Sequence, residues 1–164
     1  MKGRLTVTRG GVVGTITALV LVACATAQTA KTPEQIVEER QGVMKKNGEA
    51  WKHVQDQLKA GTIEGVATDA ETMASNGKMI PSLFPQGSMT DKSKAKPEVW
   101  QKWPEFEAAA KNMVAQSEKL RDAAKTNDKA AVEAVAKDFG RQACGTCHQP
   151  FRVPPPQQPA PPRS

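Results

Sequence analysis

Apolar residues recur at helical spacing along most of the chain, and the clearest stretch lies between Thr32 and Gly61. They form two neighbouring rows with a seven-residue repeat: Val37, Met44, Trp51 and Leu58 in one, and Ile36, Val43 and Ala50 in the other. Such a stripe is typical of a helix packed in a bundle. Thr32, Pro33 and Gln35 form a capping-box pattern that predicts where this helix begins, and Gly61 predicts where it ends.

Three more amphipathic helices follow. The second is predicted from about Thr62 to Asn76, where Asn76-Gly77 is a stop signal. The third opens at Pro97, and Trp103-Pro104 predicts a kink or a restart near its beginning. Thr126-Asn127-Asp128 predicts a short turn and cap before the fourth helix. Together the four helices predict an all-α protein, an antiparallel four-helix bundle.

The connection between the second and third helices, residues 78–96, is too long to be a simple turn. Loops of this length inside a compact domain are usually functional or cover another part of the protein. Its apolar residues Ile80, Leu83 and Phe84 indicate that it packs against the bundle.

The fourth helix delivers the motif Cys144-Gly145-Thr146-Cys147-His148, which is the attachment signature of a c-type haem. Residues three apart lie on one face of a helix, so the thiols of Cys144 and Cys147 can both reach the two vinyl groups of one porphyrin. His148 follows at once and is the expected proximal ligand of the iron. The sequence therefore predicts one haem c, bound covalently through both cysteines near the C-terminus.

Three other interpretations of these cysteines stay open. A thioredoxin-like dithiol would belong in a strand-to-helix turn, and no such context is visible. A zinc site would need more ligands, and the remaining candidates are His53, which we expect on the surface, and Cys24. A disulfide, or a chance occurrence of the motif, is the third alternative.

Length, cysteine content and charge limit the other classes. The 164 residues allow one domain, and three cysteines are too few for a disulfide scaffold. The net charge of +6 falls to +3 if Lys2, Arg4 and Arg9 are cleaved away, and there is no compact basic run. We therefore expect no nucleic-acid partner.

The N-terminus has the features of an export signal. After its three cations comes a mostly apolar run, Val12 to Val22, which is too short to argue for a membrane-spanning helix. Ala25-Thr26-Ala27 is a cleavage site that would make residues 1–27 a signal peptide. Leu21-Val22-Ala23-Cys24 resembles a bacterial lipobox, which would give a lipoprotein signal over 1–23. Membrane association is expected only if Cys24 is lipidated.

These signals divide the chain into three parts. Residues 28–153 form the four-helix-bundle cytochrome domain. Residues 154–164 are rich in proline and glutamine and are expected to be a disordered tail. Export carries the domain out of the cytoplasm, to where bacterial c-type haem is attached. We therefore expect a periplasmic protein, lipid-anchored on the periplasmic side if the lipobox is used.

A bundle with its haem motif at the end of the last helix resembles the cytochrome c prime family. The resemblance runs from about residue 32 to 153. It is carried by three groups of residues, in this order: Arg40-Gln41-x-x-Met44, Pro97-Glu98-Val99-Trp100, and Cys144-Gly145-Thr146-Cys147-His148-x-x-Phe151-Arg152. The last group is highly specific, and the first two add weight through their order.

The resemblance implies roles for four residues around the haem. A methionine at the position of Met44 is the distal iron ligand in a low-spin branch of the family, whereas a bulky apolar residue there leaves the iron five-coordinate in the other branch. Lys45 and the loop over residues 80–85 look more like the low-spin branch. Arg40 and Gln41 resemble the residues that hold the haem propionates. Arg152 matches an arginine just past the proximal histidine.

These observations predict an exported monohaem cytochrome that transfers one electron at a time to redox partner proteins, with no catalytic residues, and which is not an enzyme. The alternative is a five-coordinate haem protein that binds or scavenges nitric oxide or carbon monoxide. Four other methionines are expected to fill space: Met73, Met79, Met89 and Met113. Family members often form antiparallel dimers through their first two helices, although four lysines make that surface charged here: Lys45, Lys46, Lys52 and Lys59.

Overall fold

The structure is a computed structural model that describes Gly3 and residues 30–155. Apart from Gly3, the predicted signal peptide (1–27) and the alternative lipoprotein signal (1–23) lie outside the described residues, as do all but the first two residues of the predicted tail. Within the described part of the chain, no helix combines the length and the apolar character needed to cross a membrane.

The first helix, α1 (Pro33–Lys59), begins as its capping box predicts. The Thr32 hydroxyl accepts a hydrogen bond from the Gln35 amide at 3.3 Å, and the Gln35 side chain accepts one from the Thr32 amide at 2.9 Å. Each bond satisfies a backbone donor that the first helical turn would otherwise leave unpaired. The helix ends before Gly61, whose φ of +79° is the left-handed conformation that glycine adopts easily.

The buried face of α1 is more polar than the two apolar rows predicted. Arg40, Asn47 and Gln57 are buried beside the expected valines and alanines, whereas Met44 and Trp51 are only half-buried. The Asn76 amide donates to Asn47 at 2.7 Å, which joins α1 to the next helix inside the core. The apolar pattern therefore identifies which side of α1 faces the core, but that side also contains buried polar residues that the pattern does not show.

The second helix, α2 (Val66–Met79), begins and ends later than the sequence predicts. Thr62 and Ile63 are irregular and Glu64 and Gly65 form a turn, where the Gly65 amide donates to the Gln57 side chain at 2.6 Å. Asn76-Gly77 does not stop the helix because both residues are buried in contacts with neighbouring helices. Tertiary packing has overridden a local stop signal here.

The chain then crosses to the other half of the bundle through a packed connection. It contains one 3₁₀ turn, η1 (Pro81–Leu83), and its apolar residues Ile80, Leu83 and Phe84 are buried as expected. A short helix, α3 (Glu98–Gln101), is followed at once by α4 (Trp103–Lys125), so the predicted restart at Trp103-Pro104 is confirmed.

The predicted turn at Thr126-Asn127-Asp128 is also confirmed. Asn127 adopts a positive φ of 54°, and the Asp128 side chain caps the next helix by accepting from the Ala131 amide at 3.1 Å. The last helical segment has three parts: α5 (Lys129–Phe139), a π-helical turn η2 (Gly140–Gly145) and α6 (Thr146–Phe151).

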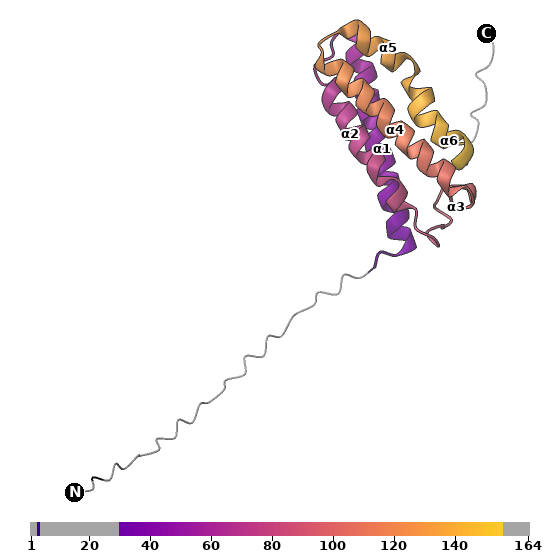
Figure 1. Cartoon of the computed structure of the whole chain (residues 1–164). Helices are drawn as coiled ribbons and strands as arrows, with labels where there is room; N and C mark the ends of the chain where they lie inside the picture. Colours follow the sequence, from indigo (N-terminus) through magenta and orange to yellow (C-terminus); the bar gives the residue numbers. More distant parts are fainter. Residues whose placement is uncertain (1–2, 4–29, 156–164) are drawn as a thin grey trace, which may run out of the picture. The chain divides into compact units, whose positions relative to one another are not determined.

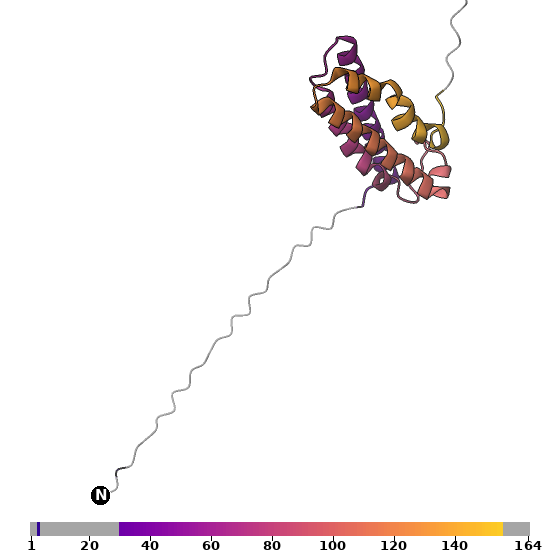
Figure 2. The same cartoon turned by 45° about the horizontal axis from the view of Figure 1, so that its top comes forward.

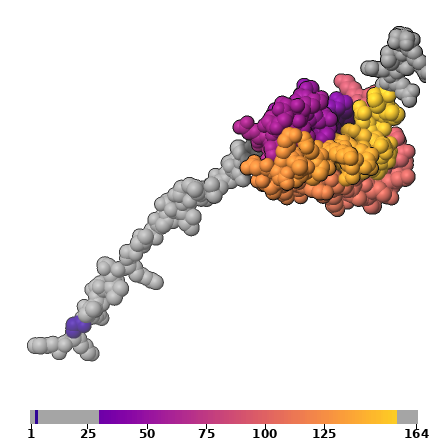
Figure 3. Space-filling view, turned by 90° about the horizontal axis from the view of Figure 1, so that it is seen from above, coloured from indigo at the N-terminus to yellow at the C-terminus, as the bar shows by residue number. Residues whose placement is uncertain are grey.

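Figures 1 and 2 show four long helical segments side by side: α1, α2, α4 and the α5–η2–α6 segment. Successive long segments run in opposite directions, so the all-α antiparallel four-helix bundle is confirmed. Figure 3 shows α5 and α6 (orange to yellow) beside the first half of the bundle (purple). Trp51 of α1 stacks on Phe139 of α5, with 4.6 Å between ring centroids.

Gly77 allows α2 and α4 to approach closely, and its replacement by alanine is expected to destabilise the protein. A Cβ at this position would lie 2.8 Å from Cγ2 of Val114. Overpacking costs about 1–3 kcal/mol, while a glycine-to-alanine change in a helix contributes about 1 kcal/mol. We expect a net loss of about 1 kcal/mol in the free energy of unfolding, measured by guanidinium denaturation.

Gly48 provides the matched control, because a Cβ there would meet no atom within 4 Å. Gly48→Ala should therefore stabilise α1 by about 0.5–1 kcal/mol. If both variants raise or both lower the free energy of unfolding, the close contact between Gly77 and Val114 does not account for the effect of Gly77→Ala.

Candidate haem site

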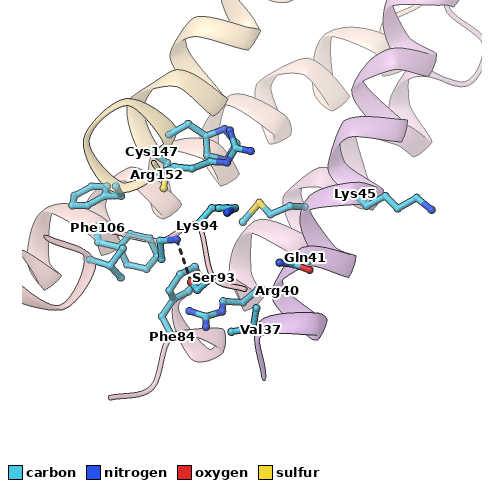
Figure 4. A pocket seen from close by; sticks show the side chains of 15 residues that line it. Val37, Arg40, Gln41, Lys45, Phe84, Ser93, Lys94, Phe106, Cys147 and Arg152 are labelled. Carbon is cyan, nitrogen blue, oxygen red and sulfur yellow. Dashed lines mark hydrogen bonds between the residues drawn. The ribbon is translucent and has the colours of Figure 1, made fainter. Parts of the chain in front are cut away.

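A cavity of about 520 Å³ lies at the end of the bundle where α1 begins and α6 ends. This volume is within the usual range of ligand sites in proteins. Figure 4 shows the side chains that line it. Helix α1 contributes Val37, Arg40, Gln41, Met44 and Lys45, and the α2–α3 connection contributes Phe84, Ser93, Lys94 and Ala95. Val99 comes from α3 and Phe106 from α4. Cys147, His148 and Phe151 come from α6, and Arg152 follows it.

Cys147 and His148 line this cavity, and Cys144 packs half-buried against the core beside it. Cys144 and Cys147 form no disulfide with each other. Met44, on α1, lines the same cavity as His148, on α6. The fold therefore brings together residues that are about a hundred positions apart in the sequence and that the motif and the resemblance had singled out.

A π-helical turn presents the motif. In an α-helix, residues five apart point in different directions, but the wider i→i+5 turn of η2 brings them closer to one line. Cys144 is five residues after the buried Phe139, so the turn rotates its thiol toward the core face. Isolated π turns occur mostly at functional sites.

Asn112 of α4 supports this turn from outside. Its side-chain amide donates to the carbonyl of Gln142 at 2.5 Å and to the hydroxyl of Thr146 at 3.3 Å. These bonds satisfy polar groups that the irregular hydrogen-bond ladder of η2 leaves available. Sequence reasoning missed Asn112, because nothing in its local pattern distinguishes it from a surface polar residue.

We expect Asn112→Ala to lower the free energy of unfolding by about 1–2 kcal/mol, because the Gln142 carbonyl loses a partner. Hydrogen exchange should become faster in residues 140–146 than in α2. Gln116→Ala is the control on the same helix, since Gln116 is half-buried without a side-chain hydrogen bond among the described residues. Equal exchange rates in the two variants would contradict a special role for Asn112.

The electrostatics of the cysteines do not fit a reactive dithiol. Burial raises the pKa of Cys144, and burial together with the neighbouring Cys144 raises the pKa of Cys147 to about 11. A redox-active thiol needs a lowered pKa, because the thiolate is the reactive form. Within the described residues there is also no cluster of three or more histidine, cysteine or acidic side chains for a metal such as zinc.

Arg40 is the most unusual residue in the cavity wall. It is only 4% exposed, its guanidinium lies 4.4 Å from the centre of the Phe84 ring, and Nη2 donates to the carbonyl of Ser88. Its Nη1 is buried and has no hydrogen-bond partner in the described part of the chain. Burial lowers the pKa of Arg40. A buried cation with a free donor fits a carboxylate such as a haem propionate.

Gln41 and Arg152 also border the cavity. The Gln41 side chain donates to the carbonyl of Lys92 at 3.1 Å, so it holds the α2–α3 connection against α1. Arg152 and Ala95 form an antiparallel bridge, in which the Lys96 amide donates to Phe151 at 2.9 Å and the Val153 amide donates to Lys94 at 2.8 Å. Arg152 lies four residues after His148, and its amide donates to the His148 carbonyl at 3.2 Å. Burial and the charge of Arg152 both lower the pKa of His148.

The remaining candidates lie away from the cavity. His53 is exposed, as expected, and its Nδ1 lies 2.7 Å from a carboxylate oxygen of Asp69 in α2. None of the four other methionines lines the cavity. Met73 and Met113 are buried in the core, whereas Met79 and Met89 are exposed. The prediction that these methionines fill space in the core therefore holds for Met73 and Met113 and is wrong for Met79 and Met89.

The residues fit a covalently bound haem. The cavity is lined mainly by apolar and aromatic side chains, and the Cys147 thiol and the His148 imidazole belong to its lining. Arg40, also in the lining, has a buried Nη1 without a hydrogen-bond partner among the described residues. This combination on a helical bundle defines a c-type haem protein.

Comparison with known proteins assigns this haem protein to a family. A model described as Cytochrome C' matches residues 35–152. The chain is 32% identical over 142 residues to cytochrome c-556 of Agrobacterium fabrum, covering 85% of this chain and 94% of the relative. The chain belongs to the cytochrome c prime family, whose members carry one covalently bound haem c.

Solved structures share the fold of this chain. Cytochrome c' from Rubrivivax gelatinosus superposes with a TM-score of 0.66 at 26% identity, covering 75% of this chain and 98% of that one. A cytochrome c' with an unusual ligand-controlled dimer dissociation superposes with a TM-score of 0.70 at 24% identity, covering 76% and 99%. Relatives named c-556 and relatives named c' both occur, so the names alone do not choose between the two branches.

Proposed function

We propose that this protein is an exported one-electron carrier whose haem iron is held by His148 and Met44. The observation that supports this proposal most is that Met44, from α1, and His148, from α6, line one cavity together with Cys147. A thioether sulfur and an imidazole nitrogen are a common axial pair in electron-transfer cytochromes.

The chain's own residues have separate tasks in this proposal. Cys144 and Cys147 anchor the haem, and His148 is the proximal ligand. When bound, the haem supplies a single-electron couple between ferrous and ferric iron. Arg40 offers its unpaired Nη1 to a propionate, while Gln41 keeps the adjoining loop in place. The apolar wall around Phe84 and Phe106 keeps water away, which is one way a protein sets the reduction potential.

The second candidate is a five-coordinate haem protein that binds nitric oxide or carbon monoxide. It is favoured by the apolar character of the wall around Met44, which includes Val37, Val99 and Phe106. A small uncharged gas would enter such surroundings without loss of hydrogen bonds. In this case Met44 is a neighbour of the sixth coordination site and does not occupy it.

Visible absorption spectra of the purified holoprotein separate the two candidates. The protein should be measured oxidised, reduced, and reduced under carbon monoxide. Sharp, split low-spin bands that barely respond to the gas are the result expected for an electron carrier. Broad high-spin bands that change at once with the gas would overturn the electron-carrier proposal and establish gas binding.

Location and assembly follow the sequence predictions. We propose a periplasmic protein that exchanges electrons with other redox proteins. We also propose a homodimer through α1 and α2, guided by the structural neighbour whose dimer dissociates under ligand control. Sedimentation of the holoprotein with and without carbon monoxide would test this assembly. A monomer under both conditions would refute it.

A further inference from the structure

We propose that the mouth of the haem cavity is the docking face for a redox partner that presents an acidic protein surface. This inference rests on the proposed electron-transfer function and names the chemistry of the partner. It comes from the distribution of charged and apolar side chains around the cavity.

The Lys, Arg, Asp and Glu side chains in the cavity wall are all cationic. Of the fifteen residues that line it, four carry a positive charge, and none of these described residues carries a carboxylate: Arg40, Lys45, Lys94 and Arg152. The adjoining loop over residues 86–97 adds two more lysines against a single aspartate. The three exposed cations Lys45, Lys94 and Arg152 come from three different elements, and we call them the cationic rim.

The rim is not neutralised by the protein itself. Among the described residues, Lys94 and Arg152 form no ion pair, and Lys45 lies 3.8 Å from Glu49 with both side chains largely exposed. An exposed pair of this kind contributes little and leaves the lysine free to turn to another partner. Elsewhere on the surface, cations meet carboxylates closely, as in Lys78 with Glu118 at 2.9 Å.

The two propionates of a haem would offset at most two of the four positive charges that line the cavity. Arg40 is the cation suited to a propionate, because it is buried and has an unpaired donor. A partner protein cannot reach Arg40, but it can reach the three exposed members of the rim. Within a Debye length of about 8 Å at physiological salt, their charges act together on an approaching surface.

Apolar side chains accompany the rim. The described part of the chain exposes three large hydrophobic residues, Met79, Met89 and Val153. Met89 follows Ser88, which bonds to Arg40, and Val153 follows Arg152 and bonds to Lys94, so two of the three border the mouth. Apolar groups with charged neighbours are typical of a protein interface. A membrane surface would favour an amphipathic helix instead, and here the border consists of a loop and a helix end.

Electron exchange with small ions tests the charge of the mouth. Reduced holoprotein is mixed in a stopped-flow instrument with ferricyanide or with tris(phenanthroline)cobalt(III). At low ionic strength, the double variant Lys45→Glu/Lys94→Glu should react with ferricyanide at least about tenfold more slowly and with the cobalt complex faster. The double variant Lys59→Glu/Lys125→Glu, which makes the same change in net charge away from the cavity, should change either rate by less than about twofold.

Binding of poly-L-glutamate, measured by calorimetry, gives a readout that does not depend on electron transfer. The unmodified protein and the Lys59/Lys125 variant should bind it alike, and the rim variant at least about tenfold more weakly. If the two double variants change the electron-transfer rates and the polyglutamate affinity equally, the docking face is overturned, because the net charge of the protein alone would then account for both measurements. The protein can also be sedimented with phosphatidylglycerol vesicles. If the rim variant loses binding to the vesicles but keeps its affinity for polyglutamate, the docking face is overturned in favour of a membrane surface.

The two proposals fail in different ways. If the unmodified holoprotein exchanges electrons with neither ion, electron transfer is refuted, and polyglutamate binding alone decides whether the mouth recognises acidic surfaces. If it exchanges electrons but both double variants behave alike, the docking face is refuted and electron transfer stands.

Discussion

Replacement of Met44 with alanine should turn a low-spin haem protein into one that is high-spin and binds carbon monoxide. Met44 is half-buried in the α1 wall of the cavity, and it is the thioether sulfur that the structure places there. Under the proposed ligation by Met44, loss of this donor opens the sixth coordination site, and the reduction potential should fall, because methionine ligation raises it. Absorption spectra and a redox titration measure both effects.

Met113→Ala is the matched control, because Met113 is buried in α4 and does not line the cavity. It should cost about 2–5 kcal/mol of stability and leave the spectrum unchanged. A Met44→Ala spectrum identical to that of the unmodified protein would mean that Met44 does not ligate iron. Gas binding would then become the leading function.

The largest loss of stability is expected for Phe106→Ala. The Phe106 ring is 2% exposed and lies 4.8 Å from Phe84, 5.4 Å from Phe151 and 5.4 Å from Trp103, measured between ring centroids. It therefore joins α4, the α2–α3 connection and α6 in one aromatic cluster. We expect a loss of about 3–5 kcal/mol in the free energy of unfolding, a large part of the total for a domain of this size.

Phe139→Ala separates stability from the haem site. Phe139 is also buried, but it stacks on Trp51 away from the cavity. Both variants should unfold at lower guanidinium concentrations, while only Phe106→Ala should also alter the haem spectrum. A loss below about 1 kcal/mol for Phe106→Ala would show that the aromatic cluster does not hold the cavity walls together.

Signals that act within a few residues predicted much of this fold. The capping box at Thr32, the restart at Trp103 and the cap at Asp128 each depend on local hydrogen bonds or on proline geometry, and all three are present. The end of α2 depends instead on Gly77 packing against Val114. No pattern within α2 can show a contact with a helix that begins more than twenty residues later.

The candidate site divides in the same way. The haem motif is recognisable because its chemistry requires fixed spacing between Cys144, Cys147 and His148. The support for that motif is not recognisable, because η2 depends on Asn112, which lies about thirty residues earlier. The orientation of Arg40 likewise depends on Ser88 and Phe84 from a separate segment. Long-range polar contacts thus escape sequence reasoning even where their partners are correctly named.

The bridge between Ala95 and Arg152 makes two walls of the cavity a single unit of local unfolding. Its backbone hydrogen bonds tie the α2–α3 connection to the residues that follow α6, so neither segment can open while the other keeps all its bonds. The side of the cavity that carries His148 and the loop that faces Arg40 must therefore loosen together. We therefore expect hydrogen exchange of the Lys96 and Val153 amides to be correlated.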